Sequence, residues 1–374
     1  MKKKVLLVAT VQSHICQFHK ALVEVLHEQN IEVHVAARDN LAEKNGMKLD
    51  FVEKVFNVPF SRSPKSLDNL KAYKQLKQII DTNGYDVIHC NTPMGGIVTR
   101  LAAQKARKKG TTLIYTAHGF HFYEGAPKKN WLVFYPIEKF FSRLTDKLVT
   151  ITQEDYNLAS KKFHCEVHRI HGVGVDERRY YPADDQMKSE IRKELGYTDD
   201  EKLILCIGEL LPNKNQRMAI RMMEKLVKDI PEAKLLIAGN GPERENLENL
   251  VKELRLENQV EFLDYCTYLE KYQRAVDLGV SCSKREGLPL NVVESMLTKN
   301  PVVVSKNRGH RELVRHEETG YLVNVNGVQA MYEHVKKLLL DEEHRVTMGV
   351  HAAAFAQEFN FTYVKEELKK VYGL

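Results

Sequence analysis

No apolar run in this sequence approaches the roughly 18 consecutive residues that a membrane-spanning helix requires, so we expect no such helix. The opening Met-Lys-Lys-Lys and the apolar stretch 5–10 could imitate a signal peptide. That stretch is too short, however, and it passes directly into Gln12, Ser13 and His14 without a small-residue cleavage site. We therefore interpret it as a first buried strand.

Paired cysteine spacing is also missing, which argues against a disulfide framework. The six cysteines are scattered, and Cys90, Cys206 and Cys282 each lie in or beside a strand-like apolar run. This usage suits reduced, buried thiols in the cytoplasm. No nucleic-acid motif or base-stacking pattern is present either, so we predict no nucleic-acid partner.

The 374 residues are too many for one ordinary hydrophobic core, which predicts two domains. Apolar strand-like runs alternate with amphipathic helical stretches, stop at a polar region around residues 182–200, and then start again. Such alternation predicts an α/β fold of two Rossmann-like, doubly wound parallel-sheet domains. We place these domains at residues 1–180 and 181–354, with a C-terminal helix at about 355–374 packing back on the first.

The stretch 280–294 reads as a strand, a polar turn and the start of a helix, with Glu286 before the turn and Glu294 inside the helix. Gly287 and Pro289 favour a break between them. A helix N-terminus suits a diphosphate, and nearby acids could hold hydroxyl groups. Acids eight residues apart are common by themselves, so it is the strand–loop–helix context that carries the interpretation. Ligands of such folds bind at the strand ends, and the cleft between two facing domains is the expected active site.

The charge is unevenly distributed along the chain. Residues 1–180 hold 28 Lys and Arg against 18 Asp and Glu, whereas the remainder holds 28 against 32. The basic residues of the first half form two clusters, the second of which lies near an apolar and aromatic run, residues 131–137. The first cluster is Arg100, Lys105, Arg107, Lys108 and Lys109, and the second is Lys128 and Lys129. Basic and aromatic surface of this kind fits an anionic membrane face, although solvated surface lysines would look the same.

Six short segments of the second half occur in an informative order: GELLPNKN at 208–215, AGNGP at 238–242, REGLPLNVVE at 285–294, and PVVVS, GHRELV and TGYLV between 301 and 323. Together they resemble the retaining glycosyltransferases of family 4, also called group 1, which have the GT-B fold. YDVIHCNTP at 85–93, YTAHGFHF at 115–122 and YPIEK at 135–139 resemble its bacterial exopolysaccharide and capsule branch. The resemblance covers essentially the whole chain.

The resemblance implies roles for the stretch 280–294. Glu286 matches a glutamate that contacts the transferred sugar, and Gly287 and Leu288 would offer backbone N–H groups to the diphosphate and the sugar. Glu294 matches the glutamate that binds the ribose hydroxyls. An acid near a helix start is also favoured by the helix dipole alone.

The motif at 208–215 implies the cation of the donor site. Lys214 matches the lysine that reaches the donor diphosphate, where fixed positive charge stabilises the leaving group, and Gly208 is grouped with it as donor-binding. Many members have an arginine where this chain has Glu209. Whether Arg217, Arg308 or a helix N-terminus replaces that arginine is left open by the sequence.

His118 ends a strand where the family places an active-site histidine near the donor sugar, and we assign it a catalytic role together with Glu286. His121, three residues further on, is the rival, and either could be a structural histidine. The role implied for His118 is to contact the sugar, not to act as a nucleophile.

The first strand–helix loop departs from the family, because residues 10–16 contain none of the glycines that many relatives carry there. His14 and His19 could instead form part of the acceptor side. His89 and Asn91 at another strand end, and His121, are further acceptor-side candidates. Each of these could equally be a core or surface residue.

We predict no metal and no cofactor, the nucleotide-sugar being a co-substrate. The pairs Asp184-Asp185 and Asp199-Asp200 lie in linker-like sequence and lack supporting ligands.

The sequence as a whole predicts a hexosyltransferase that moves a sugar from a nucleotide-sugar, most simply a UDP-sugar, to a saccharide acceptor carried on polyprenyl diphosphate. It would work in the cytoplasm, peripherally on the inner face of the cell membrane. A UDP-sugar 2-epimerase of the same shape is one alternative. A catalytically silent nucleotide-sugar-binding subunit of a polysaccharide assembly complex is another.

Overall fold

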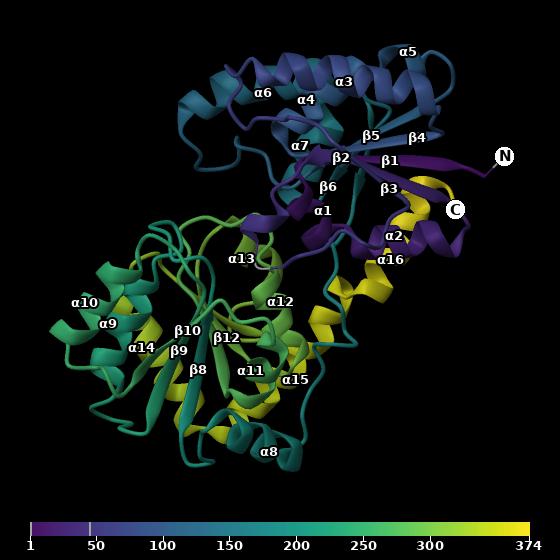
Figure 1. Cartoon of the computed structure of the whole chain (residues 1–374). Helices are drawn as coiled ribbons and strands as arrows, with labels where there is room; N and C mark the ends of the chain where they lie inside the picture. The colour runs from purple at the N-terminus through teal and green to yellow at the C-terminus, as the bar shows by residue number, and fades with distance from the viewer. Residues whose placement is uncertain (1, 45) are drawn as a thin grey trace. The chain divides into compact units, whose positions relative to one another are not determined.

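The computed structural model describes residues 2–44 and 46–374, and these form two compact units (Figure 1). Unit 1 contains Met1–Gly174 and Phe361–Leu374, and unit 2 contains Val175–Asn360. The chain therefore passes from unit 1 to unit 2 between residues 174 and 175 and returns between 360 and 361, whereas the sequence predicts these points at 180 and about 355.

Unit 1 is built on a seven-stranded parallel sheet in the order β3-β2-β1-β4-β5-β6-β7. Its strands are β1 (Lys4–Val11), β2 (Glu32–Arg38), β3 (Lys54–Asn57), β4 (Val87–Asn91), β5 (Thr112–Ala117), β6 (Lys147–Thr150) and β7 (Glu166–Arg169). The central strand β1 is buried from residue 5 to its end, because both faces of a parallel sheet are covered by helices.

The helices of unit 1 are α1 (Gln12–Phe18), α2 (Lys20–Glu28), η1 (Leu41–Glu43), α3 (Asp68–Asn83), α4 (Pro93–Ala102), α5 (Gln104–Arg107), α6 (Lys128–Ser142), α7 (Gln153–Lys162) and α16 (Phe361–Tyr372). The predicted first loop over residues 10–16 is wrong. Strand β1 continues to Val11 and α1 starts at the next residue, so the chain has a strand–helix junction without an intervening loop.

The last helix, α16, belongs to unit 1 and lies beside α2 (yellow and purple in Figure 1). Lys365 of α16 forms ion pairs with Glu24 and Glu28 of α2. Near the end of α16, the Tyr372 hydroxyl lies 2.7 Å from Nδ1 of His89 in β4. The C-terminal helix is thus attached at both its exposed and its buried face.

Unit 2 contains a six-stranded parallel sheet in the order β10-β9-β8-β11-β12-β13. Its strands are β8 (Lys202–Ile207), β9 (Ala233–Ala238), β10 (Val260–Asp264), β11 (Leu278–Ser281), β12 (Val302–Ser305) and β13 (Gly320–Val323). Its helices are α8 (Asp185–Leu195), α9 (Gln216–Leu226), α10 (Arg244–Glu253), α11 (Leu269–Ala275), α12 (Leu290–Leu297), α13 (Arg308–Leu313), α14 (Val328–Leu340), α15 (Glu342–Ala356) and η2 (Gln357–Phe359).

The predicted irregular linker at 182–200 is also wrong, because it contains helix α8. The Asp184 carboxylate accepts a hydrogen bond of 2.8 Å from the Met187 amide and caps the helix, and Gly196 ends it in a left-handed conformation. Asp199 accepts a hydrogen bond from Ser189 of the same helix. These acids therefore serve local structure in α8.

Two parallel-sheet, Rossmann-like units confirm the predicted α/β fold class. Within residues 2–44 and 46–374, no helix combines the length and the apolar character needed to cross a membrane.

The predicted basic and aromatic surface of the first half is wrong in two residues. Arg100 is buried and paired with Glu138 of α6, and Trp131 packs against the core of unit 1, where its indole donates to the Tyr123 carbonyl. The exposed apolar side chains of α6 are Leu132, Val133, Phe134, Ile137 and Phe140.

Candidate functional site

The carboxyl ends of β9, β8, β11 and β12 lie next to one another in the sheet of unit 2, so the loops that follow them converge. Gly208 follows β8 and Gly239 follows β9. Gly239 has a φ of +140°, and a Cβ there would lie 2.2 Å from the Gly208 carbonyl oxygen. Only glycine allows these two strand ends to approach so closely.

The loop after β8 is tied to the loop after β11 by two hydrogen bonds. The Lys284 amide donates to the Asn213 carbonyl at 2.8 Å, and the Asn213 side-chain amide donates to the Arg285 carbonyl at 3.0 Å. This connection places Lys214 beside Glu286, with Nζ 2.6 Å from Oε1. Two residues assigned separately from the sequence thus form one ion pair.

The Lys214–Glu286 pair is only partly exposed, at 25% and 14% of the two side chains. An ion pair in such surroundings is stronger than one in open water, yet each partner can still exchange the other for a ligand. A diphosphate could take Lys214, and sugar hydroxyl groups could donate to Glu286. The geometry is therefore that of a site able to bind an anionic and hydroxylated ligand.

His310, which we did not predict, completes this group. It is fully buried, and burial lowers its pKa to about 4, although Glu286 raises it in part. Nδ1 lies 2.5 Å from the Ser305 carbonyl, so Nδ1 carries the proton, and the buried Nε2 has no hydrogen-bond partner among the described residues. Gly309 allows the close approach of α13, because a Cβ there would lie 2.6 Å from the Gly287 carbonyl.

Glu294 is the fifth residue of α12, as predicted for an acid inside the helix. Desolvation raises the pKa of Glu294 to about 7, while a hydrogen bond with Tyr180 and the charge of Arg179 act in the opposite direction. The carboxyl group is therefore poised between its two charge states near neutral pH, which is common where a carboxylate awaits a polar ligand.

We expect Glu294→Gln to stabilise the chain by roughly 3 kcal/mol at pH 8 and by less than about 1 kcal/mol at pH 5. The folded-state pKa of about 7 lies above the ordinary value of 4.5, so stability is fully present below pH 4.5 and is lost as pH rises through 7. Glutamine removes that loss because it has no charge. Calorimetric melting of both proteins at the two pH values checks this, and a variant less stable at pH 8 would contradict it.

Many members of the family have an arginine at the position where this chain has Glu209, and the Glu209 side chain is exposed. The positive charge must therefore come from another residue. Of the two candidate arginines, Arg308 is buried, with 6% of its surface exposed. Arg217 is exposed on α9 and, together with Lys284, lines a hollow of about 150 Å³ beside the loop that carries Lys214. Arg217 is therefore the candidate with access to a ligand.

In unit 1, His118 follows the end of β5 and is brought together with two other sequence-predicted residues. Its Nε2 lies 3.2 Å from Nε2 of His14 and 3.2 Å from Oδ1 of Asn91. Burial lowers the pKa of His118 to about 4, so the imidazole is neutral at physiological pH. A neutral imidazole can donate or accept a hydrogen bond with a sugar hydroxyl.

His89 and His121 lie apart from that contact. Both ring nitrogens of His89 form hydrogen bonds, one with the hydroxyl of Tyr372 and one with that of Thr116, at 2.7 Å each. These contacts give this buried residue a structural role. His121 stacks on Phe134 of α6, with ring centroids 4.7 Å apart. The acceptor-side assignments of His14, His89, Asn91 and His121 stay predictions.

The architecture of both units is that of the GT-B glycosyltransferases. The structure of Anabaena HepE in complex with UDP and glucose aligns with a TM-score of 0.78 at 21% identity, covering 99% of each chain. The structure of WaaG, a glycosyltransferase involved in lipopolysaccharide biosynthesis, aligns with a TM-score of 0.76 at 15% identity over 99% of this chain and 100% of that one.

Sequence comparison then identifies the family. Residues 187–354 match the family described as Glycosyl transferases group 1, and residues 4–152 match the one described as Glycosyl transferase 4-like. The chain is 37% identical to the putative glycosyltransferase EpsD of Bacillus subtilis (strain 168) over 376 residues, covering 100% of this chain and 97% of the relative. This chain belongs to the glycosyltransferase group 1 family and is a hexosyltransferase.

A more distant relative has a more detailed description. The UDP-Gal:alpha-D-GlcNAc-diphosphoundecaprenol alpha-1,3-galactosyltransferase of Escherichia coli is 23% identical over 342 residues, covering 89% of this chain and 87% of the relative.

Proposed function

We propose that the chain transfers a sugar from a UDP-sugar to a saccharide carried on polyprenyl diphosphate, with retention of anomeric configuration, in exopolysaccharide or capsule biosynthesis. The observation that carries this proposal is the Lys214–Glu286 pair beside His310 at the strand ends of unit 2. The E. coli relative, whose name specifies a UDP-sugar donor and a diphosphoundecaprenol acceptor, supports the substrate classes. HepE, described in complex with UDP and glucose, supports the donor.

In the proposed reaction Lys214 exchanges Glu286 for the donor diphosphate and stabilises the negative charge that grows on the departing UDP. Glu286 is then free to accept hydrogen bonds from the transferred sugar and does not act as a covalent nucleophile. The acceptor hydroxyl attacks the same face that UDP leaves and passes its proton to the leaving phosphate. This step is proposed to need no metal.

The remaining residues hold the donor in place. Glu294 accepts hydrogen bonds from the ribose hydroxyls, Gly287 and Leu288 offer backbone N–H groups to the diphosphate and the sugar, and Gly208 is grouped with Lys214 as donor-binding. His118 is assigned to the transferred sugar by family resemblance.

Acceptor-dependent release of UDP tests the proposed function. A panel of UDP-sugars is incubated with and without a polyprenyl-diphosphate-linked N-acetylhexosamine, and UDP and sugar products are measured. We expect UDP release only with the acceptor, and a product whose new bond keeps the anomeric configuration of the donor by NMR. An epimerised free UDP-sugar would support the epimerase alternative, and binding without turnover would support the silent subunit.

A lipid-linked acceptor would require the enzyme to work at a membrane, and α6 offers a suitable face. Leu132 and Phe140 are 78% and 55% exposed, and the exposed Lys128 and Lys129 begin the same helix. Apolar side chains flanked by cations suit the boundary of an anionic bilayer. We propose that α6 docks unit 1 on the inner membrane face.

We expect the wild-type chain to co-sediment with anionic liposomes, and Leu132→Asp to reduce the bound fraction severalfold because it places a charge where apolar contact is needed. Leu67→Asp is the matched control, since Leu67 is equally exposed at 78% in the same unit but lies at the start of α3. Equal binding by the two variants, or equal recovery in the supernatant with and without liposomes, would contradict the docking of α6.

A further inference from the structure

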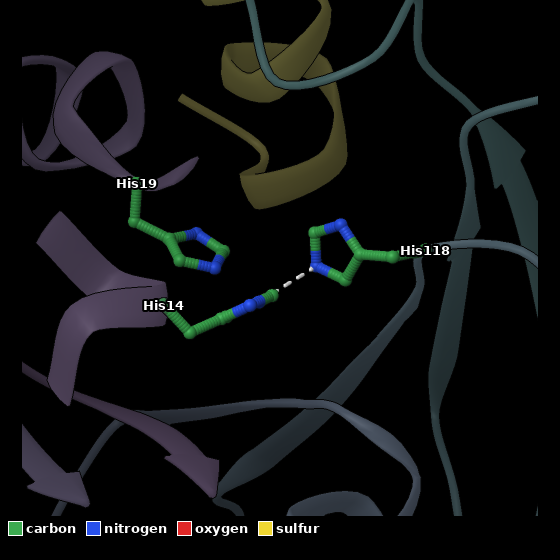
Figure 2. A group of neighbouring side chains, drawn as sticks. All are labelled: His14, His19 and His118. Atoms are coloured by element: carbon green, nitrogen blue, oxygen red, sulfur yellow. Dashed lines mark hydrogen bonds between the residues drawn. The ribbon is translucent and has the colours of Figure 1, made fainter. Parts of the chain in front are cut away.

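Three histidines of unit 1 surround a common space at the start of the chain's first helices. His14 lies in α1, His19 links α1 to α2, and His118 follows β5. Figure 2 shows the three side chains pointing toward a common space. One ligating nitrogen from each lies within 4.8 Å of the other two, and no other group of three or more His, Cys, Asp or Glu in residues 2–44 and 46–374 meets this criterion.

The distances suit a transition-metal ion. Zinc binds imidazole nitrogen at 2.0–2.1 Å in tetrahedral geometry, which requires about 3.3–3.4 Å between two ligating nitrogens. The Nε2 atoms of His14 and His118 already lie 3.2 Å apart. The third nitrogen lies up to 4.8 Å away and would need to move inward by up to about 1.5 Å, which rotation of a side chain can supply.

The chemistry of the three rings fits as well. His19 is 4% exposed, and its Nε2 has no hydrogen-bond partner among the described residues, which leaves a buried nitrogen directed at the other two histidines. Burial lowers the pKa of all three imidazoles, and neutral imidazole is the form that binds metals. A polar nitrogen buried without a partner costs stability, and a metal bond would recover that cost.

Two features define the state of the ion. Asn91 Oδ1 accepts from His118 Nε2, so a metal at that nitrogen requires the proton to shift to Nδ1. The charge of Arg62 acts on His14, and the cluster contains no carboxylate, so a dication would keep its positive charge. The fourth coordination position of the metal would therefore be occupied by water, by hydroxide or by a different anion.

We propose that His14, His19 and His118 form a binding site for one zinc ion or a similar imidazole-preferring transition metal. The sequence gives no sign of it, because the third ligand lies 104 positions from the first and no metal-binding motif links them. The hard cation Mg²⁺ is not expected to bind, since it prefers oxygen ligands. If the proposed function is also correct, zinc on His118 withdraws that nitrogen from the donor sugar and inhibits transfer.

Metal titration of the untagged, chelator-treated full chain tests the site without any substrate. We expect one Zn²⁺ per chain by calorimetry, and visible absorption bands of tetrahedral Co²⁺ when cobalt replaces it. His14→Ala and His118→Gln should each weaken Zn²⁺ binding by at least roughly tenfold and abolish the cobalt bands. His351→Ala is the matched control because His351 is exposed on α15.

Binding that is as tight in His14→Ala and His118→Gln as in His351→Ala would overturn the proposal, as would binding no tighter than that of Mg²⁺. Circular dichroism of each variant establishes that it is folded, and both substituted residues, His14 and His118, are partly exposed. Because the titration contains no donor or acceptor, absence of sugar transfer would leave the metal result intact, and absence of metal binding would leave the transfer result intact.

Discussion

Lys214→Ala is expected to lower kcat/KM for the nucleotide-sugar by roughly 10²–10³-fold, the usual effect of removing one fixed charge that stabilises a developing anion. The 2.6 Å contact with Glu286 means that the substitution also leaves a half-buried carboxylate without its cation. That carboxylate then repels the donor diphosphate, so binding should weaken together with the chemical step. The measurement is acceptor-dependent UDP release under initial-rate conditions.

Glu286→Gln and Lys225→Ala show whether a loss of activity in Lys214→Ala comes from the missing cation itself, from the unpaired Glu286 carboxylate or from the removal of any surface lysine. Glu286→Gln removes the counter-ion but keeps Lys214, so we expect donor binding to persist while the rate of transfer falls. Lys225 is exposed on α9, and its replacement should leave activity near that of the wild type. Activity of Lys214→Ala within about threefold of Lys225→Ala would contradict the role given to Lys214.

Much of the fold follows from the sequence because both sheets are parallel. Strands buried on two faces, such as β1 and β8, are continuous apolar runs that stand out between amphipathic helices. Helix α8 was missed because it is mostly polar and because its one buried charged residue, Arg192, lies in an ion pair with Asp277, 85 positions away. A cation that pairs with an acid distant in the sequence looks like a solvated residue when only the sequence is read.

Sequence motifs predict individual residues of the candidate site, but they do not predict the contacts between those residues. Lys214 and Glu286 were identified individually, but their contact depends on Asn213 joining two loops, which no local pattern indicates. Tyr180 and His310 were missed for the same reason. The GHRELV motif at 309–314 contains His310 and could have drawn attention to it, whereas Tyr180 has no local signal.

Arg100 gave no sign of burial either, because it precedes a run of surface cations in the sequence. The structure places its side chain, which is 1% exposed, between the rings of Tyr115 and Phe141 at 4.0 and 4.8 Å. Its guanidinium donates to the Gly96 carbonyl at 3.1 Å and to the Glu138 carboxylate at 3.0 Å. Arg100 thus holds α4, β5 and α6 together.

We expect Arg100→Ala to reduce the free energy of unfolding of unit 1 by roughly 3–5 kcal/mol, because it leaves a cavity and the Glu138 carboxylate buried without its cation. Trp131 is the one tryptophan of the sequence and packs against Phe122 and Tyr135, so its fluorescence during urea unfolding reports on unit 1. The partly exposed Arg107, paired with Asp146 at 2.8 Å, is the control, and Arg107→Ala should cost about 1 kcal/mol.

The double replacement Arg100→Met with Glu138→Leu decides which physical cause dominates. If the unpaired carboxylate accounts for most of the loss, removing both charges should restore stability to within about 1–2 kcal/mol of the wild type, since buried ion pairs can often be exchanged for apolar side chains of similar volume. If the double variant is as unstable as Arg100→Ala, the stacking of the guanidinium on Tyr115 and Phe141 and its bond to Gly96 carry the stability instead. The fluorescence of Trp131 does not report on unit 2, because unit 2 contains no tryptophan. A second calorimetric transition that these substitutions leave unchanged would show that the two units unfold separately.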